Sequence, residues 1–137
     1  MNSIVVVVKG LILHNGKVLI VKRAAEDEVG GGTWECAGGK IEFGEELEAA
    51  LRREIKEEVG LDVTFDRILY ATTFNTHPSR QVVILTYLCH GDHQEVSLSK
   101  EHSAYKWTTK DQLRYLLSPG IVSDFEKNKV FDLPELV

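Results

Sequence analysis

The segment GKIEFGEELEAALRREIKEEVGL, residues 39–61, is the most informative part of this 137-residue chain. Apolar residues recur through its centre at near-helical spacing, which predicts an amphipathic helix over residues 47–59. Glu54, Glu57 and Glu58 stand at i, i+3 and i+4, so this helix would place three carboxylates on one face. Such like charges destabilise a bare helix, whereas a hard divalent cation would turn their repulsion into a binding site. The segment therefore predicts a metal site, and the alternative is a solvated acidic helix without chemistry.

The composition is that of a single globular domain. A chain of this length can bury one hydrophobic core, so we expect one domain over residues 1–137. The net charge of −5 argues against nonspecific nucleic-acid binding, which needs a basic surface. Residues 42–58 hold seven glutamates and three basic residues, so −4 of that charge lies there. An acidic helix repels a polyphosphate unless cations bridge the two, so the charge distribution itself favours metal.

Two further features bear on membrane association and on the redox state of the compartment. The apolar N-terminal run Ile4–Val8 is interrupted by Lys9 and is too short for a membrane span or signal peptide, so we expect a strand and no membrane association. Cys36 and Cys89 lie far apart and match no metal-ligand or redox spacing. Two buried reduced thiols are expected, which fits a cytoplasmic protein, with a disulfide as the less favoured alternative.

Strands and helices alternate along the chain without repeats, which predicts a mixed α+β domain. Asn15-Gly16 between two apolar runs predicts a hairpin, and residues 24–33, with three consecutive glycines, predict a loop. The expected strands are Ile4–Leu13, Lys17–Arg23, Trp34–Ala37, Val63–Phe74, Val82–His90 and Tyr105–Thr108; the other expected elements are a polar turn at 75–80, a helix at Lys110–Leu117 and a last turn or helix at Ser123–Lys127.

The predicted site suits one kind of chemistry. A hard-cation site on a helix, entered through a glycine-bearing loop, fits phosphate anhydrides better than peptides or esters. Cations on phosphate oxygens neutralise the charge that develops as the P–O bond breaks, and they also activate water as a nucleophile. Bound Mg²⁺ would further link an acidic protein to an acidic substrate.

The spacing of the charged and glycine positions resembles the Nudix box, the signature of the Nudix hydrolase family. The box reads G, five residues, E, seven residues, R-E, an apolar residue, any residue, E-E, any residue, G and an apolar residue. The resemblance implies the family's α/β/α sandwich with a mixed sheet, in which the box forms a loop-helix-loop. It also implies a Mg²⁺- or Mn²⁺-dependent hydrolase of nucleoside diphosphates linked to another moiety. The matching positions are Gly39, Glu45, Arg53, Glu54, Ile55, Glu57, Glu58, Gly60 and Leu61.

The resemblance also implies roles for residues of the box. Glu57 and Glu58 are expected to be the main metal ligands, and Glu54 a ligand or the general base on the attacking water. Arg53 lies four residues before Glu57, within reach of an ion pair that orients the carboxylate, with direct substrate contact as the alternative. The backbone carbonyl of Gly38 is expected to complete the metal shell.

Four further residues are assigned roles, and three of them lie outside the box. Arg23 ends a predicted strand where related enzymes often carry a basic residue facing phosphate, and Phe74 could stack on a base; both are predicted to bind substrate. Glu101 resembles the family's late acidic residue, a further ligand or alternative base. Glu45 is expected to complement the helix N-terminus or join the metal shell. The family commonly has proline where this chain has Ala37, and none of the five histidines has metal-ligand spacing, so none is assigned.

Three functions are compatible with these residues. The first is Mg²⁺-dependent hydrolysis of nucleoside triphosphates, including non-standard or oxidised ones, to monophosphate and pyrophosphate; the small single domain favours it. The second is the same chemistry on ADP-ribose, nucleotide sugars or dinucleoside polyphosphates, for which Pro78 is an imperfectly placed cue. The third is a nonhydrolytic nucleotide-sensing module, which would be expected to lose glutamates that this chain keeps. Family members are often dimers, so a homodimer stays open.

Overall fold

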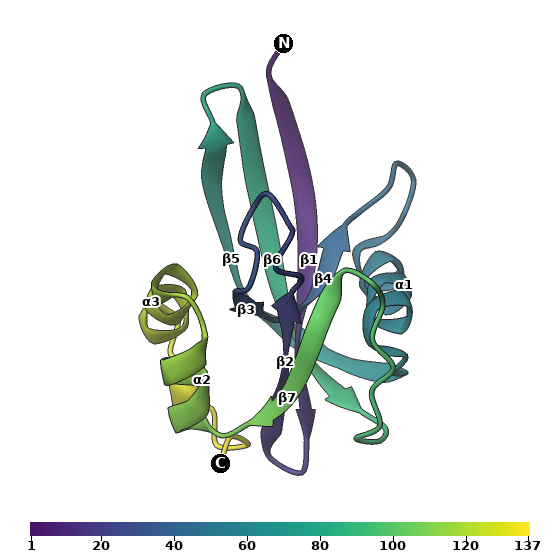
Figure 1. Ribbon diagram of the computed structural model, residues 1–137, viewed down its shortest axis with the longest axis vertical. Helices are drawn as coiled ribbons and strands as arrows, with labels where there is room; N and C mark the ends of the chain where they lie inside the picture. The colour runs from purple at the N-terminus through teal and green to yellow at the C-terminus, as the bar shows by residue number, and fades with distance from the viewer.

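A mixed sheet of seven strands organises the molecule, and the computed structural model describes all of residues 1–137 (Figure 1). The strand order is β3-β2-β1-β6-β5, with β4 pairing to β1 and β7 to β2. The elements are β1 (Ser3–His14), β2 (Lys17–Arg23), β3 (Trp34–Glu35), β4 (Ala37–Lys40), α1 (Leu47–Val59), β5 (Val63–His77), β6 (Arg80–Gly91), β7 (His102–Thr108), α2 (Lys110–Leu116), α3 (Pro119–Lys127) and the 3₁₀ turn η1 (Val130–Asp132).

β1 is the central strand of this sheet. It runs parallel to β6 from the pair Ser3–Arg80 to the pair Leu13–His90, and antiparallel to β2 and β4. The β1–β2 hairpin turns at Asn15 and Gly16, both with positive φ, as the Asn-Gly pair predicts. The apolar run of β2 is buried throughout, which is typical of a strand covered on both faces.

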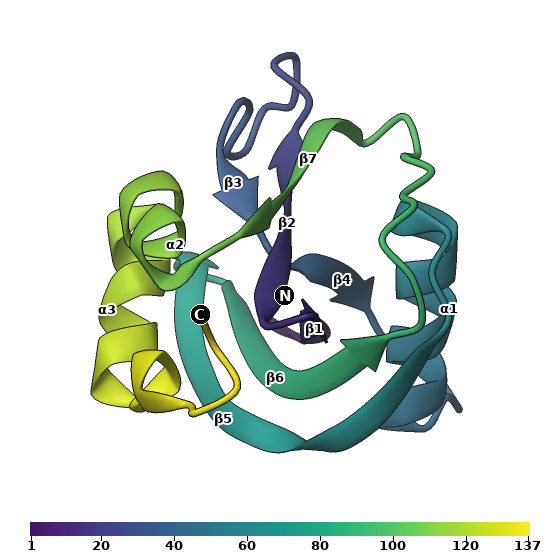
Figure 2. The same ribbon diagram turned by 90° about the horizontal axis from the view of Figure 1, so that it is seen from below.

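Helices cover both faces of the sheet. Viewed from below, α1 lies on one side of the strands and α2 and α3 on the other (Figure 2). Each side has its own apolar core of 13 buried residues: one contains Ala50, Leu51, Ile55 and Val59 of α1, and the other contains Phe125 of α3. The predicted α/β/α sandwich with a mixed sheet is confirmed.

The helix that carries the predicted metal face has the predicted bounds. α1 spans Leu47–Val59 and ends at Gly60, whose left-handed φ of 73° lets its N–H bond the carbonyl of Lys56. Its buried apolar residues fix one side of the helix against the sheet. The charged residues must therefore lie on the remaining surface.

Several element boundaries differ from those expected. Residues 75–77 continue β5 instead of opening a polar turn, because pairing with β6 extends to His77–Arg80 despite the polar side chains. β7 begins at His102 rather than Tyr105, since it pairs with β2 as far as Arg23. The last helix begins at Pro119, a residue favoured in the first helical turn, rather than at Ser123. None of the helices is long and apolar enough to cross a membrane.

Candidate active site

Two glycines bring β4 close to its neighbours. Gly38 pairs with Lys9 of β1 at a φ of 149°, and a Cβ there would collide with the backbone of Val8. A Cβ on Gly39 would lie 2.6 Å from the carboxylate carbon of Glu54. Glycine at both positions therefore lets β4 pack against β1 on one side and against a glutamate of α1 on the other.

Arg53 joins the loop before α1 to the helix surface. Its Nε and Nη2 donate to both carboxylate oxygens of Glu45, at 2.9 and 2.8 Å. Its Nη1 donates to Glu54 at 3.0 Å and to Glu57 at 3.5 Å. The bonds from Arg53 hold the pKa of the Glu45 carboxyl at about 2, and Glu45 in turn raises the pKa of Arg53. The predicted ion pair to Glu57 is present, but the bidentate partner of Arg53 is Glu45.

Glu54, Glu57 and Glu58 are here called the acidic face. Their side chains differ in exposure, which their spacing along the helix did not indicate. Their side chains are 16%, 60% and 4% exposed, in that order. The difference follows from helix geometry, since consecutive residues are about 100° apart and Glu58 is turned inward while Glu57 faces solvent. No three His, Cys, Asp or Glu side chains of the chain lie close enough together to form a ready-made metal cluster.

The buried member of the acidic face has an unusual environment. Glu58 accepts a hydrogen bond from the Gly38 N–H at 3.4 Å, and burial raises the pKa of its carboxyl well above the ordinary value. Lys9 opposes this shift in pKa, and neighbouring Glu54 adds to it. Two adjacent carboxyl groups, one of them buried, make up an oxygen-only donor set that fits a hard divalent cation. Glu54 and Glu58 therefore fit a metal as they stand, and Glu57 can join them by turning its exposed side chain.

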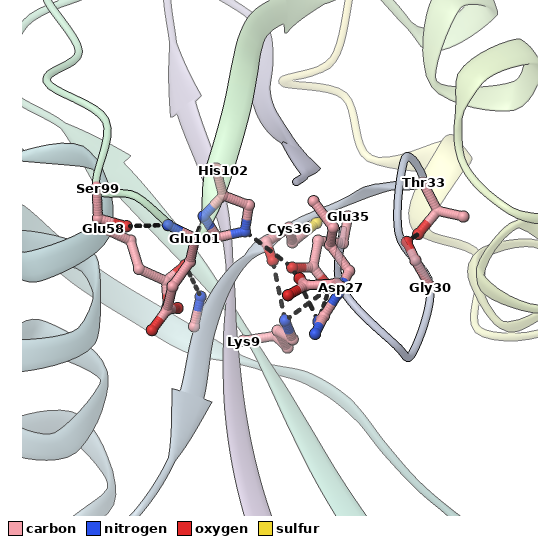
Figure 3. Close-up of polar contacts among 12 residues, drawn as sticks. Lys9, Asp27, Gly30, Thr33, Glu35, Cys36, Glu58, Ser99, Glu101 and His102 are labelled. Atoms are coloured by element: carbon pink, nitrogen blue, oxygen red, sulfur yellow. Dashed lines mark hydrogen bonds and ion pairs between the residues drawn. The ribbon is translucent and has the colours of Figure 1, made fainter. Parts of the chain in front are cut away.

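A second polar cluster lies beside the acidic face and is centred on Glu35. Its carboxylate accepts hydrogen bonds from Nζ of Lys9 at 3.4 Å and Nε2 of His102 at 2.9 Å (Figure 3). It also accepts from Nη1 of Arg23 at 3.3 Å. His102 also approaches Glu58, with 3.7 Å between Nδ1 and Oε1, so it lies between the two clusters. No histidine was predicted in the site, and the fold brings His102 into contact with both Glu35 and Glu58.

Lys9 and Glu35 were missed because they lie within expected strands and belong to no motif, and His102 was missed because it precedes the expected strand Tyr105–Thr108. The one available signal was Lys9, a lysine within the apolar run of β1, since lysine is seldom buried without a partner. Glu35 and His102 lie 67 residues apart in the chain. Only the pairing of β2 with both β3 and β7 brings them together.

A cavity of about 700 Å³ opens beside this second cluster. Lys9, Arg23 and Glu35 line it, together with Phe74 of β5 and Asp124 of α3. Both residues predicted to bind substrate, Arg23 and Phe74, therefore face the same cavity. Phe74 is 47% exposed, so it is not a core residue. A further hollow of about 500 Å³ over α2 and α3 contains none of the predicted site residues.

The side chain of Glu101 forms no hydrogen bond or ion pair with the acidic face or with the Glu35 cluster. It is exposed, and its contacts are made by its backbone, whose carbonyl accepts from the N–H of Ala24 at 3.0 Å. Its place, one residue before His102 and β7, nevertheless keeps it on the loop that borders the acidic face.

The Glu35 cluster predicts a pH dependence of stability. Burial alone would raise the pKa of Glu35, but His102, Lys9 and Arg23 outweigh it and lower the pKa from 4.5 to about 2. A depressed folded-state pKa means that Glu35 stabilises the fold above pH 4.5 and that this stabilisation is lost as pH falls toward 2.

We therefore expect Glu35→Gln to lower the free energy of unfolding at pH 7 by about 1–3 kcal/mol, because its basic partners lose their counter-charge. The variant should also lose less stability than wild type between pH 4.5 and pH 2. Urea unfolding at pH 7, and at pH 4.5 and pH 2, measures the two effects. Glu28→Gln, at an exposed glutamate of the neighbouring loop, is the control; equal pH dependence in Glu35→Gln and wild type would contradict the assignment.

Comparison with known proteins places this geometry in a family. The profile of the NUDIX domain matches residues 4–126. The chain is 32% identical over 115 residues to the CTP pyrophosphohydrolase of Escherichia coli (strain K12), covering 83% of each protein. It is also 32% identical over 113 residues to the nucleoside triphosphatase NudI of Escherichia coli O17:K52:H18, covering 75% of this chain and 80% of that one.

Solved structures share the fold. The MutT protein from Methanosarcina mazei Go1 aligns with a TM-score of 0.84 at 23% identity, over 96% of this chain and 97% of that one. The E. coli ORF135 protein aligns with a TM-score of 0.77 at 27% identity, over 96% and 93% of the two chains.

Proposed function

Because the chain belongs to the Nudix hydrolase family and is a nucleotide pyrophosphatase, we propose that its substrates are nucleoside triphosphates, including non-standard or oxidised ones. The products are the nucleoside monophosphate and pyrophosphate, and the cation is Mg²⁺ or, in its place, Mn²⁺. Two similar proteins, a CTP pyrophosphohydrolase and a nucleoside triphosphatase, support the choice of triphosphates.

The observation that supports this proposal is that the acidic face lies beside a cavity whose lining includes two basic side chains. Lys9 and Arg23 line the cavity, and His102 spans from their partner Glu35 to Glu58. A polyphosphate needs positive charge along its length, which two basic side chains supply on one side and bound cations would supply on the other. The carboxylates alone would repel it.

Within this proposal the residues of the Nudix box have three roles at the phosphates: metal binding, acceptance of a proton and orientation of the glutamates. Glu57 and Glu58, with the carbonyl of Gly38, would hold Mg²⁺; the chemistry that a bound Mg²⁺ would supply there is neutralisation of charge on the phosphate oxygens and activation of water. Glu54 is a further ligand or the base that accepts the proton of that water. Arg53 orients Glu54 and Glu57 through its bonds to both carboxylates.

Three residues outside the acidic face complete the proposed site. Arg23 binds phosphate from the cavity side, and Phe74 stacks on the base across the same cavity. Glu101, on the loop beside the acidic face, is a further ligand or an alternative base. Because no side-chain bond holds Glu101 in place, it is free to turn toward a bound cation.

We also propose a cellular location and a class of partner for the protein. Both cysteines are buried and unpaired, which supports a cytoplasmic location. The acidic net charge supports a small-molecule partner rather than nucleic acid. A homodimer, common in the family, stays a prediction.

The test is a hydrolysis panel with Mg²⁺, in which products are identified by mass. The panel contains standard and oxidised nucleoside triphosphates, ADP-ribose, nucleotide sugars and dinucleoside polyphosphates. We expect the highest kcat/KM for a triphosphate. Turnover confined to ADP-ribose, sugars or dinucleotides would replace the proposed substrate class, and tight binding of a nucleotide without turnover of any compound would indicate a sensor.

A further inference from the structure

His102 is the only one of the five histidines that is buried. Its ring lies between glutamates from two different elements, Glu35 of β3 and Glu58 of α1 (Figure 3). The Nε2 atom is 2.9 Å from Oε2 of Glu35, and Nδ1 is 3.7 Å from Oε1 of Glu58. A histidine in this place contacts both the Glu35 cluster and the acidic face.

The contacts of Glu35 determine how the ring is oriented. Lys9 and Arg23 form ion pairs with the Glu35 carboxylate, and an ionised carboxylate can only accept hydrogen bonds. The Nε2 atom of His102 must therefore carry a proton, which it donates to Glu35. This anchors the ring and leaves Nδ1 directed at the carboxyl group of Glu58.

The Nδ1 atom is buried without a hydrogen-bond partner, which is rare for a polar atom inside a protein. The backbone fixes this arrangement, because the segment that precedes β7 is bonded to the end of α1. The N–H of Ser99 donates to the carbonyl of Glu58 at 3.0 Å, and the N–H of Ser97 donates to that of Val59 at 2.9 Å. The unpartnered nitrogen is thus held against Glu58.

The geometry points to His102 as a positioning residue that, with the N–H of Nδ1 directed at Oε1 of Glu58, holds this carboxylate in the orientation required to bind a divalent cation, with Glu35 as its anchor. The inference rests on the proposed function only in taking Glu58 as a metal ligand. Carboxylates that bind metals are commonly oriented by neighbouring side chains, and loss of such a neighbour typically weakens metal binding by about 10–100-fold.

Two substitutions separate this role from a contribution to folding alone. His102→Gln keeps an N–H donor near the position of Nε2, so it retains the bond to Glu35 and leaves nothing opposite Glu58. His102→Asn places its amide near Nδ1 and gives up the bond to Glu35. His90→Gln is the matched control, because His90 is exposed and the carboxylate beside it is that of Asp66 in β5, which is not part of the acidic face.

The measurement is an equilibrium titration with Mn²⁺ alone, without nucleotide, together with the unfolding temperature in EDTA. We expect His102→Gln to weaken Mn²⁺ binding about tenfold at an unfolding temperature close to that of wild type. His102→Asn should bind Mn²⁺ more tightly than His102→Gln, and His90→Gln should match wild type. Should His102→Gln not fold, Glu35→Gln replaces it, since release of the anchor must weaken Mn²⁺ binding as well.

Wild-type Mn²⁺ affinity in a folded His102→Gln or its replacement would overturn the inference. If wild type itself binds no Mn²⁺, both the inference and the proposed metal site fail. If Mn²⁺ binding depends on His102 while no triphosphate is hydrolysed, the inference holds and the proposed substrate class fails. The two claims are therefore tested separately.

Discussion

Glu57→Gln is expected to lower kcat/KM for nucleoside triphosphates about a thousandfold and to leave the unfolding temperature unchanged. A metal ion supplies several kcal/mol of stabilisation to a phosphoryl transition state, and about 1.4 kcal/mol corresponds to a tenfold change in rate. Loss of a charged ligand should remove most of that stabilisation. Folding is spared because the Glu57 side chain is 60% exposed and its one ion pair, to Arg53, is long at 3.5 Å.

Steady-state kinetics at saturating Mg²⁺ and a thermal melt measure the two halves of this prediction. Glu48→Gln is the matched control, since it makes the same chemical change about two and a half turns away on the opposite face of α1. The control should keep wild-type kcat/KM. Near-normal activity of Glu57→Gln would remove Glu57 from the list of ligands and leave the exposed part of the acidic face as a solvated surface.

Gly38→Ala is expected to lower the free energy of unfolding by about 3 kcal/mol or more. An alanine there would take up a φ of 149°, which L-residues rarely adopt, and its Cβ would collide with the backbone of Val8. Neither strand can move aside easily, because β4 and β1 pair at this point. For a domain of this size the loss corresponds to a fall in the unfolding temperature of roughly 10 °C.

Thermal melts of the variant and of Gly120→Ala test this expectation. Gly120 lies in α3, and a Cβ on it meets nothing within 4 Å, so alanine there should leave stability unchanged or raise it by less than about 1 kcal/mol. An unfolding temperature for Gly38→Ala equal to that of wild type would show that β4 does not pack against β1 as described.

The fold could be predicted where the local pattern and the tertiary environment agree. The helix at 47–59 has apolar residues at the correct spacing and a glycine at its end, and its bounds were correct to the residue. The Asn-Gly hairpin was equally clear. Residues 75–77 and 102–104 were not predicted as strand because their strand character comes from pairing with β6 and β2, whereas their own side chains do not favour a strand.

Part of the candidate site could likewise be predicted from local pattern, and part could not. Residues of one helix and the loop before it could be predicted together, because a fixed spacing along α1 determines which side chains share a face. Spacing does not reveal how far each side chain is buried, so the contrast between buried Glu58 and exposed Glu57 required the structure. Glu35 and His102 meet only through the pairing of β2 with β3 and β7, which no local pattern reports.

We propose that the acidic face of α1 binds a divalent cation that serves cleavage of a nucleoside triphosphate between its α and β phosphates. Phosphorus NMR of the products, with Mg²⁺ and with excess EDTA, tests it most directly. We predict monophosphate and pyrophosphate with Mg²⁺ and intact triphosphate with EDTA. Release of inorganic phosphate and a diphosphate, or hydrolysis that continues in EDTA, would contradict the account.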